Sequence, residues 1–153
     1  MDSKQLAAFF DPELFVLDLS VSAKPELFRK LADLLHDKGK VGNKNVVLQT
    51  ILAREELGST GLGHGVAIPH SRSLMTKSLQ LVFCRTAQPL DYAAPDSQGV
   101  RLVFLILAPP QDPANQYLPV LGKLVEFISS PEARERLLHI KSFDEFKNLL
   151  VEG

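Results

Sequence analysis

The sequence is poor in the residues that build disulfide frameworks, membrane spans and nucleic-acid-binding surfaces. It has one cysteine and no tryptophan in 153 residues, so an internal disulfide framework is excluded. Its longest apolar run, Leu102 to Pro110, is far too short to cross a bilayer. The formal net charge is −1, without a block of like charges. This balance argues against nucleic acid and against insertion into or binding to a membrane.

The overall composition is that of a soluble globular protein. Hydrophobic residues make up 45% of the chain and charged residues 23%, which are ordinary values. One domain covering residues 1–153 is expected, with a core large enough to need neither disulfides nor metals. The first residues make a poor secretory signal, so a cytoplasmic location is expected. Cys84 lies in an apolar run and is expected to be a small core residue.

Apolar spacing predicts helices that alternate with short strands. Strands are expected at residues 15–19, 79–86 and 101–108, and the last should be central because it is apolar on both faces. Ser22 is the expected N-cap of a first helix that stops at Gly39. Further helices are expected at about 44–57, over 118–128, from Ser130, and after a capping box formed by Ser142 and Glu145. The prediction is an α/β fold with helices on both sides of a sheet.

Residues 58–70 carry the most information about function. They read Gly-Ser-Thr-Gly-Leu-Gly-His-Gly-Val-Ala-Ile-Pro-His. Glycines let a backbone approach a ligand closely, and successive N–H groups in such a turn can bind an anion. Pro69 stiffens the chain before His70, so that the imidazole is aimed in one direction. This arrangement suits a histidine that accepts and passes on a phosphoryl group.

Each of these features also has a purely structural interpretation. The glycine run could be a tight loop with a surface histidine, and Arg54 could belong to a solvated helix end. His64 is expected to be an exposed loop residue. His36 and His139 lie near predicted helix ends, where the helix dipole accounts for them. The irregular spacing of the histidines argues against a zinc site.

Three segments resemble the EIIA domains of the fructose/mannitol/nitrogen class of the bacterial phosphoenolpyruvate:sugar phosphotransferase system. They are Asp-Pro-Glu-Leu-Phe-Val-Leu-Asp-Leu from Asp11, Arg-Glu-Glu-Leu-Gly-Ser-Thr-Gly-Leu-Gly from Arg54, and Gly-Val-Ala-Ile-Pro-His from Gly65. The resemblance runs from about Leu6 to Leu150. It implies the type 2 EIIA fold, a mixed β-sheet flanked by helices. The single-domain form looks most like the nitrogen-regulatory subgroup.

The resemblance also implies a phosphotransfer site. His70 matches the histidine that accepts the phosphoryl group on its Nε2 (tele) nitrogen, and Arg54 matches the arginine that stabilises the phosphate. Neither a cofactor nor a metal is required. Further donors are expected from a phosphate-binding loop: Thr60, Gly61, Gly63, Gly65 and Ser71.

Tyr117 departs from the pattern of the family. Many members carry a second histidine at the position that Tyr117 occupies, beside the acceptor histidine. A tyrosine hydroxyl can donate a hydrogen bond, but unlike an imidazole it cannot carry a positive charge.

Three functions follow from the resemblance. The first is a phosphoryl carrier that takes the group from HPr or its nitrogen-branch counterpart and passes it to an EIIB domain. The second is a regulatory module whose affinity for a target protein depends on phosphorylation of His70. The third is a scaffold that keeps the fold but transfers nothing and acts through protein–protein contacts.

Overall fold

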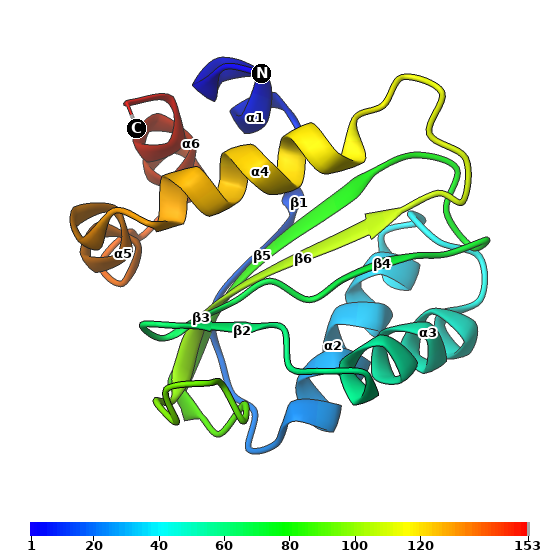
Figure 1. Ribbon diagram of the computed structural model, residues 1–153, viewed down its shortest axis with the longest axis horizontal. Coiled ribbons are helices and arrows are strands. Elements are labelled where there is room, and N and C mark those ends of the chain that lie inside the picture. The colour runs from blue at the N-terminus through cyan, green and yellow to red at the C-terminus, as the bar shows by residue number, and fades with distance from the viewer. Residues whose placement is uncertain (153) are drawn as a thin grey trace.

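The computed structural model describes residues 1–152, in which one mixed sheet is covered by helices on both faces (Figure 1). The elements in chain order are α1 (Ser3–Ala8), β1 (Phe10–Leu19), α2 (Lys24–Asp37), α3 (Lys44–Glu56), β2 (Gly61–Gly63), β3 (Val66–Ala67), β4 (His70–Arg72), β5 (Gln80–Leu90), β6 (Val100–Ala108), α4 (Tyr117–Ile128), α5 (Pro131–Leu137) and α6 (Phe143–Glu152). Every helix in this part of the chain is too short or too polar to cross a bilayer.

Strand β6 organises the sheet, whose order is β1-β5-β6-β3-β2. It pairs with β5 in antiparallel fashion along one edge. Its other edge is shared by two short parallel strands, β3 opposite Leu102 and Val103 and β4 opposite residues 106–108. All residues of β6 except Arg101 are buried. The prediction of a central strand is therefore confirmed, and so is the predicted α/β class.

The two faces of the sheet have separate cores. Helices α1, α4, α5 and α6 cover one face, where Phe83, Phe104 and Phe146 pack together, and α2 and α3 cover the other (Figure 1). Side chains of β6 alternate between these cores because successive residues of a strand point to opposite faces. Cys84 lies fully buried in the second core, as expected, and burial raises the pKa of its thiol to about 12.

The N-terminal region differs from the prediction. Helix α1 was not expected, although its start carries a capping box in which Asp2 accepts from the Gln5 N–H and Gln5 accepts from the Asp2 N–H. Strand β1 begins at Phe10 and not at Phe15. It contains Pro12, which an edge strand tolerates because one side of its backbone has no partner in the sheet.

Two predicted helix caps were wrong in detail. Helix α2 is preceded by Ala23 without a side-chain cap, while the Ser22 N–H donates to Glu26. At α6, Ser142 accepts from the Glu145 N–H, as predicted, but the Glu145 carboxylate accepts from the Lys141 N–H. The capping box is therefore only half formed.

Arg85 ties β5 to the end of α5 and is only 6% exposed. Its Nη1 donates to the carbonyl oxygens of Leu137 (3.1 Å) and Ile140 (2.8 Å), and its Nε donates to Asp18 (3.2 Å). The guanidinium thus satisfies carbonyl groups that a helix end leaves without partners.

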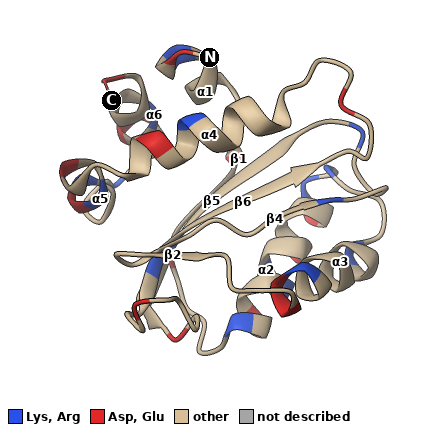
Figure 2. Cartoon of the chain, viewed as in Figure 1, with Lys and Arg blue, Asp and Glu red and all other residues tan. Residues whose placement is uncertain are grey.

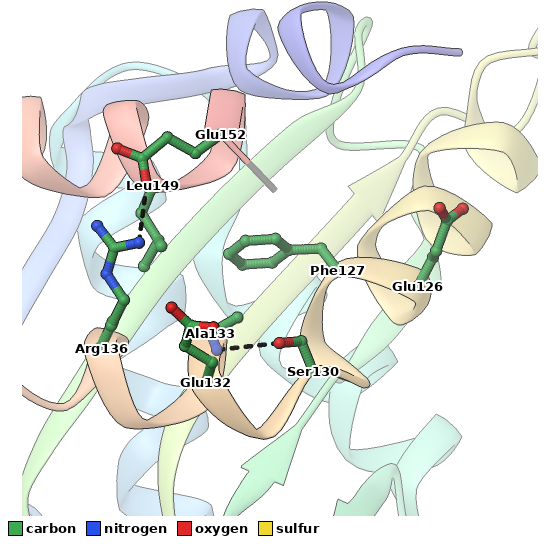
Figure 3. Close-up of a pocket in the computed structure, with 8 residues that line it drawn as sticks. All are labelled: Glu126, Phe127, Ser130, Glu132, Ala133, Arg136, Leu149 and Glu152. Carbon is green, nitrogen blue, oxygen red and sulfur yellow. Dashed lines mark hydrogen bonds and ion pairs between the residues drawn. The ribbon is translucent and has the colours of Figure 1, made fainter.

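We expect Arg85→Ala to lower the free energy of unfolding by about 3 kcal/mol, because it leaves buried acceptors unsatisfied. Arg136→Ala is the control. Arg136 pairs with Glu152 across an open surface pocket (Figure 3), and its side chain is 48% exposed. Exposed ion pairs contribute about 1 kcal/mol or less. Urea denaturation of both variants tests this difference, and equal losses of stability would contradict it.

Candidate functional site

His70 begins β4, and its imidazole is fixed by the backbone two residues earlier. Its Nδ1 lies 2.8 Å from the carbonyl oxygen of Ile68. Because a carbonyl oxygen only accepts hydrogen bonds, Nδ1 must carry the proton. The neutral ring therefore keeps its lone pair on Nε2, and the residue is partly exposed. This is the tautomer that a nucleophilic Nε2 needs.

Tyr117, the first residue of α4, lies beside His70. The two ring centroids are 6.5 Å apart and the rings are inclined at 62°. The Tyr117 N–H donates to Asp112 at 2.9 Å. Hydrogen bonds from the Gln116 and Tyr117 amides hold the pKa of Asp112 below its usual value, so this carboxylate stays charged and fixes the start of α4.

Two arginines lie near enough to Tyr117 for their charges to act on it. The guanidinium carbon of Arg72 lies 4.8 Å from the centre of the tyrosine ring, a cation–π distance. Burial raises the pKa of the Tyr117 hydroxyl, while the positive charges of Arg72 and Arg54 oppose that rise. Arg54 lies in the last turn of α3 and donates from Nη1 to the Gly58 carbonyl at 3.1 Å. The structure thus groups His70, Arg54, Arg72 and Tyr117.

Arg72 is the site residue that the sequence analysis missed. The sequence does hold one indication of its role: Arg72 lies two residues after His70, and residues two apart on a strand point to the same face. This spacing indicates a shared face only if residues 70–72 form a strand, and no strand was predicted there. The same alternation turns Ser71 to the opposite face, where its hydroxyl donates to the Arg72 carbonyl at 3.2 Å.

The glycine segment is a β-hairpin and not an open phosphate loop. Strands β2 and β3 pair with each other, and the turn at His64 and Gly65 has positive φ at both residues. The hairpin pairs with β6 near Leu102, whereas His70 pairs with Ile106. Four residues of strand correspond to about 13 Å. The structure therefore does not bring Gly63 and Gly65 to His70.

Gly61 and Gly63 allow close packing within the protein. A Cβ on Gly61 would lie 2.8 Å from the Cβ of Ala94, and one on Gly63 would lie 3.0 Å from Asp96. The Gly61 N–H already donates to the Ser59 hydroxyl, and the N–H of the exposed His64 donates to Asp96. The glycines were expected to let a ligand approach the backbone closely. In the structure the loop at residues 94–96 approaches it instead.

Thr60 belongs to a buried network behind Arg54. Its hydroxyl lies 2.6 Å from Glu55 Oε1 and 2.7 Å from the hydroxyl of Tyr92, and its N–H donates to Glu55 Oε2 at 2.9 Å. Lys24 pairs with the same carboxylate at 3.0 Å. This network closes the turn from residue 55 to residue 60, whose Gly58 carbonyl holds Arg54. Thr60 is therefore engaged as a structural residue.

Charge is unevenly spread over the elements around the site. In α4 the first charged residue is Lys123, and Figure 2 shows the helix otherwise almost free of charge. The positive charge near His70 therefore comes from α3 and β4. Among residues 1–152, no three His, Cys, Asp or Glu side chains are grouped to hold a metal ion.

The site thus holds a histidine whose Nδ1 is hydrogen-bonded and whose Nε2 keeps a lone pair, with arginines nearby, at the edge of a mixed sheet. The model of the family "Phosphoenolpyruvate-dependent sugar phosphotransferase system, EIIA 2" matches residues 8–153. The chain belongs to this family.

The relatives include both transport and regulatory proteins. The fructose-specific EIIA component of Haloferax volcanii is 29% identical over 99% of this chain and 98% of its own. The nitrogen regulatory protein IIA-Ntr from Neisseria meningitidis is 36% identical, with a TM-score of 0.88 over 95% of this chain and 99% of that chain. The mannitol enzyme IIA of Escherichia coli, solved in complex with phosphorylated enzyme IIB, is 26% identical, with a TM-score of 0.77 over 94% and 98% of the chains.

The network around Glu55 generates a prediction about pH. Burial alone would raise the pKa of Glu55, but hydrogen bonds from Thr60 and the charge of Lys24 outweigh it and lower the pKa. A carboxyl group whose pKa is lowered by folding stabilises the protein above its unfolded pKa. That contribution is lost as the pH falls through the folded pKa.

We therefore expect the free energy of unfolding to decrease less for Glu55→Gln than for the wild type between about pH 6 and about pH 3. Urea denaturation across this range measures the difference. Glu56→Gln is the matched control, because Glu56 is exposed at the same helix end. A Glu55→Gln curve parallel to that of the wild type would show that the carboxylate is not stabilised by its partners.

Proposed function

We propose that this protein is a phosphoryl carrier that accepts the group on Nε2 of His70 from a phosphohistidine of an HPr-like carrier protein. The observation that carries the proposal is the hydrogen bond between Nδ1 of His70 and the Ile68 carbonyl. That bond leaves a lone pair on Nε2 and prevents the ring from turning the wrong nitrogen outward. A neutral imidazole is a good nucleophile near pH 7.

The transfer exchanges one N–P bond for another. The Nε2 lone pair attacks phosphorus, and the carrier's imidazole leaves with the electron pair of the broken N–P bond. His70 then carries the phosphoryl group on Nε2 and keeps its proton on Nδ1, where the Ile68 carbonyl stabilises the positive ring. Catalysis of such a step requires mainly alignment and charge stabilisation. Arg54 supplies one charge, and its planar fork matches phosphoryl oxygens.

The surface around the site supports a protein as the donor. Three of the most exposed large apolar side chains are Leu57 (85%), Leu74 (82%) and Leu118 (66%). Leu57 is the C-cap residue of α3, three residues after Arg54, Leu74 follows Arg72 by two residues, and Leu118 adjoins Tyr117. Exposed apolar side chains around a reactive group are typical of a docking surface. An EIIB domain is a candidate acceptor, given the mannitol enzyme IIA solved with its IIB partner.

A regulatory role is the second candidate. The similarity to IIA-Ntr from Neisseria meningitidis favours it. In this role phospho-His70 acts as a signal that changes the affinity for a target protein, and a form that transfers nothing would act through contacts alone. Incubation with phosphoenolpyruvate, enzyme I and the carrier protein separates the form that transfers nothing from the other two, because both a carrier and a phosphorylation-dependent regulator gain one phosphoryl mass.

We expect His70→Ala to abolish phosphorylation by the phosphorylated carrier while the fold is retained, since the residue is partly exposed at a strand end. Intact mass spectrometry measures the gain of one phosphoryl group. His64→Ala is the matched control and should still be labelled, because His64 lies at the hairpin turn away from the site. Labelling of the His70→Ala protein would overturn the assignment.

We expect Arg54→Lys and Arg54→Ala to slow single-turnover phosphorylation of His70, by up to about 100–1,000-fold for the loss of one well-placed donor. The lysine variant keeps the charge but loses the bidentate fork, so it should lie between the wild type and the alanine variant. Rapid-quench measurement of phospho-protein formation gives the rates. Unchanged rates in both variants would show that Arg54 does not contribute to phosphorylation and has only a structural role at the end of α3.

A further inference from the structure

We propose that Arg72 is a second phosphoryl-binding cation, held in place by Tyr117, and that it supplies the charge which tyrosine itself cannot provide. This inference rests on the proposed function of His70 as the phosphoryl acceptor. It gives Tyr117 the role of a platform for a cation on the neighbouring strand. In this protein the second basic side chain of the site thus comes from β4, whereas in members with a second histidine it comes from the start of α4.

The backbone brings Arg72 to the correct face. His70 and Arg72 are the first and third residues of β4 and pair with Ile106 and Ala108 of β6. Residues two apart on a strand point to the same face. The contacts of both with Tyr117 agree with this geometry, at 6.5 Å between the rings and 4.8 Å for the guanidinium carbon.

Two contacts hold the guanidinium there. Its Nη1 donates to the Pro109 carbonyl at 2.9 Å, which uses one of five N–H donors. The tyrosine ring supports the planar group from one side, as aromatic rings commonly do for arginine. The remaining donors of an exposed Arg72 are available to a phosphoryl group that arrives from the carrier protein.

The charge balance requires such a group. A phosphoryl group brings up to two negative charges, and the start of α4 offers none of the opposite sign before Lys123. The ionisable groups around Tyr117 are His70, Arg54, Arg72 and the carboxylate of Asp112. Asp112 keeps one negative charge and is attracted by Arg72, whereas Arg72 and Arg54 bring two positive charges close to Tyr117. The two arginines therefore leave a net positive charge beside His70.

Arginine also differs from histidine in its pH dependence. A guanidinium remains charged at every pH at which the protein is folded, whereas an unperturbed imidazole loses its charge above about pH 6.5. A site that uses Arg72 therefore keeps its second charge across the physiological range. Rescue of an Arg72 variant by an imidazole should therefore depend on pH. If Arg72 had only a structural role, the rescue would not depend on pH.

The experiment measures single-turnover phosphorylation of His70 by the phosphorylated carrier at about pH 6 and about pH 8. We expect Arg72→Gln to be slower by about 10- to 150-fold at both pH values, the rate equivalent of one hydrogen bond to a charged group. Arg72→Lys should be intermediate. Arg29→Gln removes an exposed arginine from α2, in the layer on the other face, and should match the wild type.

A rescue variant separates charge from structure. In the double variant Arg72→Gln with Tyr117→His, an imidazole again stands beside His70. We expect it to recover most of the lost rate at about pH 6 and little of it at about pH 8. Thermal unfolding checks that every variant is folded. If Arg72→Gln does not fold, Arg72→Lys decides the matter, because an unchanged rate would then refute the proposal.

The outcomes distinguish this inference from the function on which it rests. If wild type is phosphorylated and His70→Ala is not, the proposed function stands. In that case a wild-type rate in Arg72→Gln, or a rescue that is equal at both pH values, overturns the role of Arg72 alone. If wild type is not phosphorylated, the carrier function itself fails.

Discussion

The pairing of β4 with β6 places His70, and most of the candidate site depends on this pairing. Pro69 has no N–H and separates β3 from β4, while its carbonyl accepts from the Ile106 N–H at 2.9 Å. The Ile68 N–H donates to Thr60, and the Ile68 carbonyl is left for the imidazole. The tautomer of His70 is therefore decided by the backbone hydrogen bonds of a sheet edge.

The site combines side chains from both layers of the protein. Tyr117 belongs to the layer that contains α4, and Arg54 belongs to α3 on the opposite side of the sheet (Figure 1). Side chains from opposite layers can approach one another only where the sheet ends. The short strand β4 forms such an edge, since it continues the line of β3 along β6.

Much of the architecture could be predicted because it depends on local patterns. The helical spacing of apolar residues identified α2, α3 and α4, and the apolar run of β6 identified the central strand. His70 and Arg54 were predicted from a motif, and their role in a common site stays a prediction. The class of fold followed from the alternation of these elements.

The remaining features depend on contacts between distant segments. The glycines at positions 61 and 63 suggested a ligand because glycine permits close approach, but the sequence does not show that the loop at residues 94–96 makes that approach. Arg72 was missed because the period of two is visible only once β4 is recognised, and β4 exists only through its pairing with β6. Pattern identifies local elements, whereas the partners of a three-residue strand come from tertiary structure.

The network behind Arg54 connects parts of the chain that never approach the phosphoryl group. Lys24 at the start of α2, Glu55 in α3, Thr60 before β2 and the buried Tyr92 share one cluster of hydrogen bonds. Arg54 is anchored to the turn that this cluster closes. A change of side chain at the start of α2 can thus alter the reach of Arg54 without touching it. The side chain at the start of that outer helix is thus linked, through the carboxylate of Glu55, to the turn that holds Arg54.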